Sequence, residues 1–225
     1  WISLLSGVEN AWSFTTYKSD TVTATDRYPF RINHSSNNNI RYSSIASDTS
    51  YANRPGIGGR SQVSPMDNYS SIYAGITVGN NWTTSFQRID YLNKTGYVRV
   101  NGGNETSNIL SNMTADVSQN VTSSVPYIGS FSDGYFSGDI SQVIFGTGEI
   151  KQYDIDRTEG YSMHVSGLNG DLPSNHPFRH VPPYTGTPKL NFDNNEGNLV
   201  YGFITTSDNG NVGVSKGDDN FGTFF

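Results

Sequence analysis

The residues best suited to chemistry are four acidic side chains near the end of the chain: Glu149, Asp154, Asp156 and Glu159. Paired carboxylates can act as acid and nucleophile in the hydrolysis of a glycosidic bond. These four residues fall in a segment whose apolar spacing predicts a helix, and not a strand that lines a cleft. We therefore interpret the acidic cluster as the solvated face of that helix.

The histidines could bind a metal or transfer protons, but the residues around them match no known motif for either role. They are His34, His164, His176 and His180. No pair forms the His-Glu-X-X-His motif of a zinc protease helix, and none stands beside a serine nucleophile motif. His176, between Asn175 and Pro177, is interpreted as a hydrogen-bonded structural residue. The chain has no cysteine, which excludes disulfides, cysteine zinc sites and thiol nucleophiles.

Calcium is the one cofactor that the sequence leaves open. Hard cations need clustered oxygen ligands, and Asp133 and Asp139 in "FSDGYFSGD" supply two of them. The segments "DNNEG" and "KGDDN" have a similar composition. None of the three has the spacing of an EF-hand, and ordinary turn formation by Asp and Asn also explains them.

Aromatic residues near predicted loops are the candidates for ligand binding. Sugars suit such surfaces because their C–H faces stack on rings, while Asn, Asp and backbone amides bind the hydroxyls. The candidates are Trp82, Tyr69, Tyr73, Tyr97 and Arg99. The alternative for Trp82 is an aromatic that belongs to the core or covers a sheet edge.

The elements that must position these residues are short strands. Period-two alternation between turn residues predicts strands at residues 11–19, 28–33, 70–78, 84–92, 96–102, 125–131 and 139–146. In the strand from residue 96, Val98 and Val100 should face the core, and Asn101-Gly102 should form a tight primed turn. Many strands with almost no helical period predict an all-β fold, a two-sheet antiparallel sandwich or jelly roll.

Residues 139–168 depart from this pattern. Ile140, Val143, Ile144 and Phe145 do not alternate, which predicts a strand covered on both faces. After it, apolar residues recur at intervals of three and four and predict one short amphipathic helix near residues 150–166. The predicted apolar stripe is Ile150, Tyr153, Tyr161, Val165 and Leu168.

Several motifs in this part of the chain carry a family resemblance. They are Gly138-Asp139-Ile140, Val143-Ile144, Glu159-Gly160-Tyr161, Gly167-Leu168, Leu172-Pro173 and His176-Pro177-Phe178, together with "YVRVNGG" at 97–103. In this order they resemble the closing half of concanavalin A-like lectin/glucanase domains, in the laminin G-like form of marine bacterial and phage proteins. The resemblance implies a jelly roll. It also implies no catalysis, because the Glu-X-Asp-X-Glu strand of the glucanases and the Tyr, His, Arg and Gln set of the related lyases are missing.

The composition of the chain argues against two classes of partner, nucleic acids and membranes. The net charge is −6 and the pI about 5.0, which argues against nucleic acid because that binding needs a clustered basic surface. The longest apolar runs are too short for membrane insertion. Prolines near residue 185 predict a sandwich at residues 1–184 and a β-rich extension, or the start of a following module, at 185–225. Since the chain begins with Trp1, we expect it to be part of something longer.

These observations lead to one functional hypothesis with two alternatives. The first is a non-catalytic recognition or adhesion module that binds glycans and is displayed extracellularly, on a cell surface or a virion. The second is a structural protein of a virion, fibre or surface layer, with neighbouring subunits as partners and a homo-oligomer as one form. The third is a polysaccharide-degrading enzyme or its binding appendage.

Overall fold

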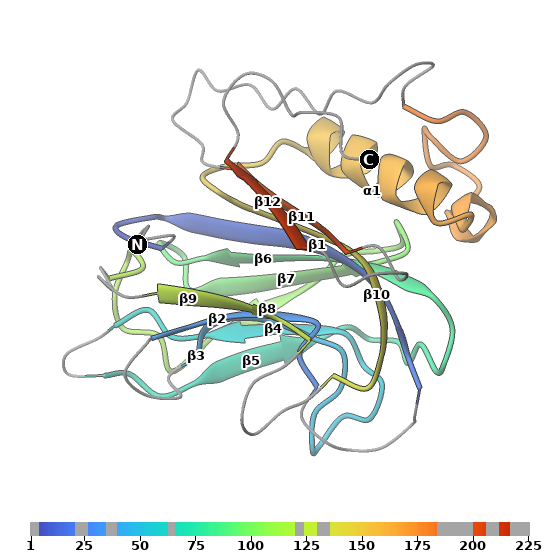
Figure 1. The fold of residues 1–225 in the computed structure, drawn as a ribbon. Helices are drawn as coiled ribbons and strands as arrows, with labels where there is room; N and C mark the ends of the chain where they lie inside the picture. Colours follow the sequence, from blue (N-terminus) through green and yellow to red (C-terminus); the bar gives the residue numbers. More distant parts are fainter. Residues whose placement is uncertain are drawn as a thin grey trace.

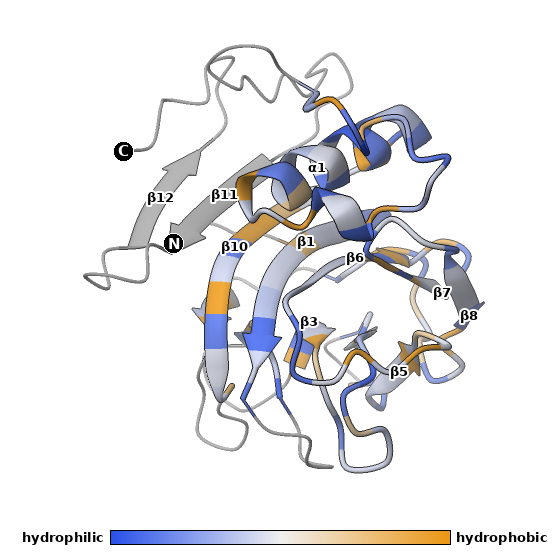
Figure 2. Ribbon diagram, turned by 90° about the vertical axis from the view of Figure 1, so that its right-hand side faces the viewer, coloured by the Kyte–Doolittle hydropathy of each residue, from blue (hydrophilic) through white to orange (hydrophobic). Residues whose placement is uncertain are grey.

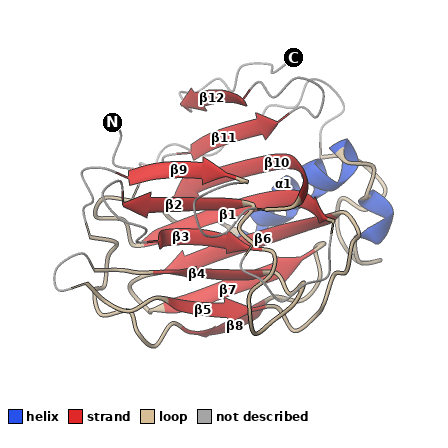
Figure 3. Cartoon of the chain, turned by 60° about the horizontal axis from the view of Figure 1, so that its bottom comes forward, coloured by secondary structure: helices blue, strands red, loops and turns tan. Residues whose placement is uncertain are grey.

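The computed structural model describes residues 5–20, 27–34, 40–62, 66–119, 124–129, 136–183, 200–205 and 212–216. Within these residues the chain forms two antiparallel sheets and one α-helix (Figure 1). The strand order is β12-β11-β10-β1-β6-β7-β8 in the seven-stranded sheet and β5-β4-β3-β2-β9 in the five-stranded sheet. The predicted all-β class, a two-sheet antiparallel sandwich of the jelly-roll type with one short helix, is confirmed (Figure 3).

Each of the seven predicted strands overlaps an observed strand. In the seven-stranded sheet they are β1 Asn10–Ser19, β6 Thr83–Asp90, β7 Thr95–Val100, β8 Thr106–Ile109, β10 Gly138–Thr147, β11 Val200–Thr205 and β12 Val212–Lys216. In the five-stranded sheet they are β2 Phe30–His34, β3 Ile40–Ile45, β4 Gly56–Gly59, β5 Ser70–Tyr73 and β9 Ser124–Ile128. The helix α1 spans Gln152–Val165, and the short 3₁₀ helix η1 spans Asn169–Asp171.

The sequence analysis missed three strands, β3, β4 and β8, and made β5 too long. The sequence of β4, Gly-Ile-Gly-Gly, is typical of a turn, yet all four residues are buried. A side chain at Gly58 would collide with Tyr69, whose hydroxyl would lie 2.2 Å from the added Cβ. Glycine is therefore present in β4 because neighbouring groups approach its backbone closely.

The main core lies between the two sheets. Phe30 and Tyr42 of the five-stranded sheet meet Phe145 of the other sheet, with ring centroids 5.4 and 5.3 Å apart. The Tyr42 hydroxyl donates to Ser13 Oγ at 2.8 Å, so its polar end is satisfied inside the core. Val98 belongs to the same cluster, as predicted.

A second apolar cluster lies on the opposite face of the seven-stranded sheet, under α1. Val143 and Phe145 face the main core, whereas Ile144 packs with residues of β1, β6 and the helix. The members of this helix-side cluster are Trp12, Phe14, Phe86, Ile144, Ile150 and Ile155. Figure 2 shows α1 lying beside β10 and β1. The prediction that β10 is covered on both faces is therefore confirmed.

The helix was placed correctly. Of its predicted apolar stripe, Ile150 is buried in the helix-side cluster, whereas two other members are mostly exposed. Tyr153 and Val165 are 62 % and 61 % exposed. The buried positions are Ile155, Thr158, Glu159, Gly160, Ser162 and Met163. Most of these are polar or small, so the apolar pattern did not mark them. Gly160 is required by close packing, because an added Cβ would lie 2.4 Å from the Cβ of Phe178.

The last two strands extend the seven-stranded sheet. β11 pairs antiparallel with β10, and β12 pairs with β11. The predicted division into 1–184 and 185–225 stays a prediction. Among the described residues, α1 and η1 are both too short to cross a membrane.

Candidate functional site

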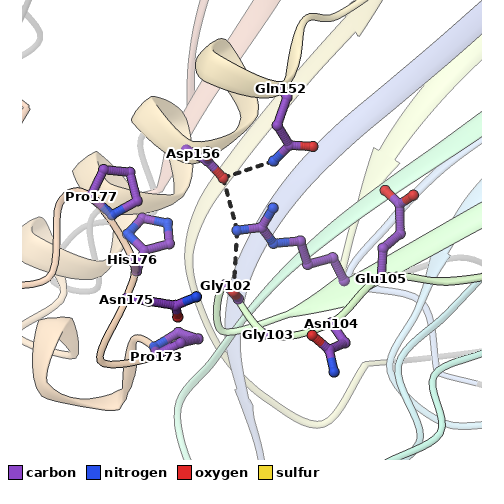
Figure 4. A pocket seen from close by; sticks show the side chains of 11 residues that line it. Gly102, Gly103, Asn104, Glu105, Gln152, Asp156, Pro173, Asn175, His176 and Pro177 are labelled. Atoms are coloured by element: carbon purple, nitrogen blue, oxygen red, sulfur yellow. Dashed lines mark hydrogen bonds and ion pairs between the residues drawn. The ribbon is translucent and has the colours of Figure 1, made fainter.

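A polar cleft of about 370 Å³ lies between α1, the β7–β8 connection and the segment after η1 (Figure 4). The helix contributes Gln152 and Asp156, the connection contributes residues 102–105, and the later segment contributes residues 173–177. Arg99 reaches the cleft from β7. Two regions of the chain that are distant in sequence, residues 99–105 and 152–177, therefore build one site.

The tight turn after β7 shapes one wall. Asn101 and Gly102 both have positive φ, 48° and 68°, so the predicted primed turn is confirmed. The Asn101 side chain fixes the turn by accepting a hydrogen bond from the backbone N–H of Thr84 at 2.8 Å. A Cβ on Gly102 would lie 2.8 Å from Leu172 and 3.0 Å from the His176 ring. The turn is thus packed directly against the opposite wall.

Arg99 joins the walls through its guanidinium. Its Nη2 lies 2.9 Å from Asp156 Oδ1 and 2.9 Å from Glu159 Oε2, and it donates to the carbonyl of Gly102 at 3.1 Å. Gln152 Nε2 also donates to Asp156 Oδ1, at 2.8 Å. The positive charge of Arg99 is therefore already shared by two carboxylates.

Glu159 lies beneath the cleft and is fully buried. Burial raises the pKa of its carboxyl group, while the polar contact with His176 and the charge of Arg99 oppose that shift. His176 Nε2 is 3.7 Å from Glu159 Oε2, which is too long for a hydrogen bond. Among the residues that the structure describes, Glu159 Oε1 has no hydrogen-bond partner. The prediction that the acidic cluster is a solvated face is therefore wrong for Glu159.

The other acidic residues are more accessible. Asp154 and Asp156 are half-buried and Glu149 is exposed. Helical spacing carried a signal for Glu159 that the prediction did not use, since Glu159 stands four residues after Ile155 and four before Met163. Both of these apolar residues are buried. A carboxylate between them on one helical face must also face inward.

The ring of His176 is held in one orientation. Its Nδ1 accepts a hydrogen bond from the backbone N–H of Phe178 at 3.2 Å. In this tautomer Nδ1 presents its lone pair to the backbone and the ring proton is on Nε2. This agrees with the structural role predicted for His176.

The same tautomer weighs against a metal ion. Ligand atoms of Asp156, Glu159 and His176 lie within 4.8 Å of one another. A metal bound at Nε2 would need the lone pair that the proton occupies. The Arg99 guanidinium also lies within 2.9 Å of both carboxylates, where it already supplies the positive charge. The donor set therefore fits an ion-pair network better than a metal.

The predicted ligand residues do not form one site. Arg99 lines the cleft, and Tyr97 lies on the same face of β7 with the Arg88 guanidinium 4.0 Å from its ring centroid. Trp82 is half-buried just before β6. Tyr69 and Tyr73 lie on or beside β5 in the other sheet. The structure places only Arg99 in the cleft.

The hydroxyls of the two β5 tyrosines are already engaged. Tyr69 Oη lies 2.8 Å from Ser43 Oγ. Tyr73 Oη donates to Asp48 and lies 3.0 Å from Ser71 Oγ. Burial, and then the hydrogen bond to Asp48, raise the pKa of Tyr73. These contacts explain both tyrosines as parts of the sheet surface, and their role in ligand binding stays a prediction.

The proposed calcium ligands can be placed only in part. Asp133 lies outside the described residues. Asp139 is exposed at the start of β10, opposite Lys18 of β1. Calcium binding at these residues stays a prediction.

Known proteins resemble this chain in structure and not in sequence. No family model matches the chain, and no curated protein matches its sequence. Solved structures do match. The CBM40 module of the Ruminococcus gnavus IT-sialidase, bound to α2,3-sialyllactose, has a TM-score of 0.46 and 13% identity, with 66% of this chain and 80% of that chain covered.

Two further structures show the same kind of likeness. A heptameric SAP-like pentraxin from Limulus polyphemus has a TM-score of 0.43 and 16% identity, over 64% of this chain and 67% of that one. The NanB sialidase of Streptococcus pneumoniae has a TM-score of 0.48 and 16% identity, over 97% of this chain and 34% of that one. The neighbours are lectin-like β-sandwiches, and the laminin G-like type stays a prediction.

Proposed function

We propose that this chain is a non-catalytic recognition module that binds carbohydrate in the cleft beside α1. The observation that carries the proposal is the chemistry of the cleft walls. Amide groups of Gln152, Asn104 and Asn175 and the carboxylates of Glu105 and Asp156 meet around one cavity. Amides and carboxylates suit sugar hydroxyls, because each hydroxyl both donates and accepts a hydrogen bond.

The backbone of the turn supports the same proposal. Gly103 has no side chain, so a ligand can approach the backbone of this wall more closely than it could beside a larger residue (Figure 4). The volume of about 370 Å³ also lies within the range of small-molecule sites. We further propose display on a cell surface or virion, which suits a chain rich in uncharged polar residues.

A glycan array probed with the 225-residue chain tests the proposal, followed by calorimetry with each bound sugar. Gln152→Ala and Asn175→Ala should each weaken binding about five- to tenfold, because each removes one hydrogen-bonding group. Tyr69→Phe and Tyr73→Phe are the matched controls in the other sheet and should leave binding unchanged. If the control variants weaken binding and the cleft variants do not, the ligand site belongs to the predicted tyrosines instead.

The same samples separate the alternatives. Carboxylates on two walls of one cleft also permit hydrolysis, so each bound oligosaccharide should be incubated with the protein and its products measured. Release of shorter products, abolished by Asp156→Asn, would replace the recognition module with an enzyme. Absence of binding to every glycan, together with a regular oligomer in solution, would favour the structural protein.

A further inference from the structure

The ion pair between Arg99 and Asp156 uses one atom of each group. Arg99 Nη2 lies 2.9 Å from Asp156 Oδ1 and also serves the contacts with Glu159 and the Gly102 carbonyl. Gln152 Nε2 donates to the same carboxylate oxygen, Oδ1. The guanidinium and the carboxylate therefore each keep a second polar end that this network does not use.

The unused end of Arg99 is a hydrogen-bond donor. Among the described residues, neither Nη1 nor Nε of Arg99 has a hydrogen-bond partner. Nε is buried, whereas Nη1 remains accessible from the cleft that Arg99 lines. Because a guanidinium has no acceptor, Nη1 can only donate to a ligand.

The unused end of Asp156 is a hydrogen-bond acceptor. Its Oδ2 contacts no polar group in the described part of the chain, and its side chain is 19 % exposed. An ionised carboxylate can only accept hydrogen bonds. Nη1 and Oδ2 each belong to the same planar group as an atom of the 2.9 Å contact, so covalent geometry keeps both near it. The cleft wall thus presents a donor and an acceptor close together.

This pairing of charges disfavours ions of either sign. An anion bound at Arg99 Nη1 would also approach Asp156 Oδ2, and a cation bound at Oδ2 would also approach the guanidinium. Each ion gains one favourable contact and one unfavourable contact. Hydroxyl groups avoid the unfavourable contact, because they can accept from Nη1 and donate to Oδ2.

The rest of the cleft suits the same kind of ligand. Gln152 stands beside Asp156 on α1, and Asn104 and Glu105 stand on the β7–β8 connection (Figure 4). These side chains offer further amide and carboxylate groups to a sugar that contacts the ion pair. Several hydroxyls of one ring can therefore be bound at once.

We propose that the cleft selects an uncharged sugar whose hydroxyls bridge the Arg99–Asp156 ion pair. One hydroxyl accepts a hydrogen bond from Arg99 Nη1, and one donates to Asp156 Oδ2. This inference rests on the proposed carbohydrate-binding function and names the class of sugar. Acidic and amine-bearing forms of the same sugar bind less tightly, since each places a charge beside a like charge of the pair.

A glycan array with matched series tests the selectivity. It carries tetramers of glucose, of galactose and of mannose, each also as the uronate and as the 2-amino-2-deoxy form, beside a broad set of other glycans. In each series that binds, the neutral tetramer should bind about five- to tenfold more tightly than both charged forms, because partly exposed charge contacts contribute modestly.

Calorimetry with the tightest neutral glycan and its uronate form tests the ion pair itself. Asp156→Asn keeps an oxygen for Arg99 but replaces the accepting Oδ2 with an amide N–H. It should weaken neutral binding about tenfold and reduce the discrimination against the uronate. Asp154→Asn is the matched control, because it removes the same charge from the same helix at a residue that lies 3.8 Å from Arg157 and outside the cleft lining. It should leave both affinities unchanged.

The outcomes distinguish this inference from the proposed function. Tightest binding of uronates or amine-bearing glycans overturns the inference and leaves carbohydrate binding intact. An Asp156→Asn variant that keeps its affinity for the neutral glycan overturns it as well, as does an equal loss in Asp154→Asn. If no glycan on the array binds, carbohydrate recognition itself fails.

Discussion

The two faces of the seven-stranded sheet are held in different ways. The inner face packs against the five-stranded sheet through aromatic and branched aliphatic side chains. The outer face meets α1 through a small apolar cluster around Ile155 and, one helical turn further on, through the ion pair of Glu159 with Arg99. Apolar packing depends on volume, whereas an ion pair depends on direction and charge. The inner contact therefore maintains the fold, and the outer contact positions the cleft.

The largest effect is expected on the inner face. Phe145→Ala should lower the free energy of unfolding by about 3–5 kcal/mol, because Phe145 is fully buried and meets both Phe30 and Tyr42. Urea denaturation measures the loss. Phe145→Leu is the matched control and should cost less than half as much. If Phe145→Ala lost less stability than a variant in the helix-side cluster, the outer face would contribute more to the free energy of unfolding than the inner face, contrary to this prediction.

The apolar part of the helix contact should rank second. Ile155→Ala should cost about 2–3 kcal/mol, whereas Tyr153→Ala should stay within about 0.5 kcal/mol because Tyr153 is mostly exposed. Denaturation gives both values, and hydrogen exchange shows whether α1 opens before the sandwich unfolds. Equal losses of stability for Ile155→Ala and Tyr153→Ala would mean that Tyr153 also packs on the sheet, as the predicted apolar stripe requires.

Close packing at Gly160 gives a smaller effect. Gly160→Ala should lower stability by about 1 kcal/mol, because overpacking against Phe178 exceeds the gain in helix propensity. Gly170→Ala, where an added Cβ meets nothing within 4 Å, is the control and should be close to neutral. A Gly160→Ala variant more stable than the wild type would contradict the contact with Phe178.

The smallest expected effect concerns charge. Burial raises the pKa of Glu159 above its unfolded value, so its stabilising contribution is complete below the unfolded pKa and is lost as pH rises through the folded pKa. Glu159→Gln removes this loss. The free energy of unfolding of the variant should therefore fall less than that of the wild type as the pH rises from acidic to neutral. Parallel stability curves for the two proteins across that range would show that Glu159 does not titrate differently on folding.

The sequence predicted what local patterns encode. The non-alternating run at Val143, Ile144 and Phe145 predicted that β10 is covered on both faces, and the Asn101-Gly102 pair predicted its turn. Both depend on residues close together in the chain. The burial of β4 could not be predicted in this way. Its glycines are required because Tyr69 and the backbone of Arg41, which are distant in sequence, approach the strand too closely for a side chain.

The cleft was not predicted either, because it is built by residues that are distant in sequence. Arg99 was proposed as a ligand residue because it points away from the core, and it does line the cleft. Its partners Asp156 and Glu159 stand more than fifty residues later, and their spacing with Arg99 carries no local signal. Helical spacing places Glu159 on the same face as Ile155 and Met163, but nothing in the local sequence identifies Arg99 as its partner.

The turn at Asn101 and Gly102 divides the wall of the cleft into a fixed part and a variable part. These two residues hold the backbone geometry, and Gly102 leaves no room for a side chain beside Leu172 and His176. Asn104 and Glu105, immediately after, are exposed and contribute no core contact. Mutations at these two positions should therefore leave the sandwich intact. A library randomised at the same two positions changes the surface of the cleft without changing the backbone turn that holds it, and is the natural starting point for engineering the proposed binding site.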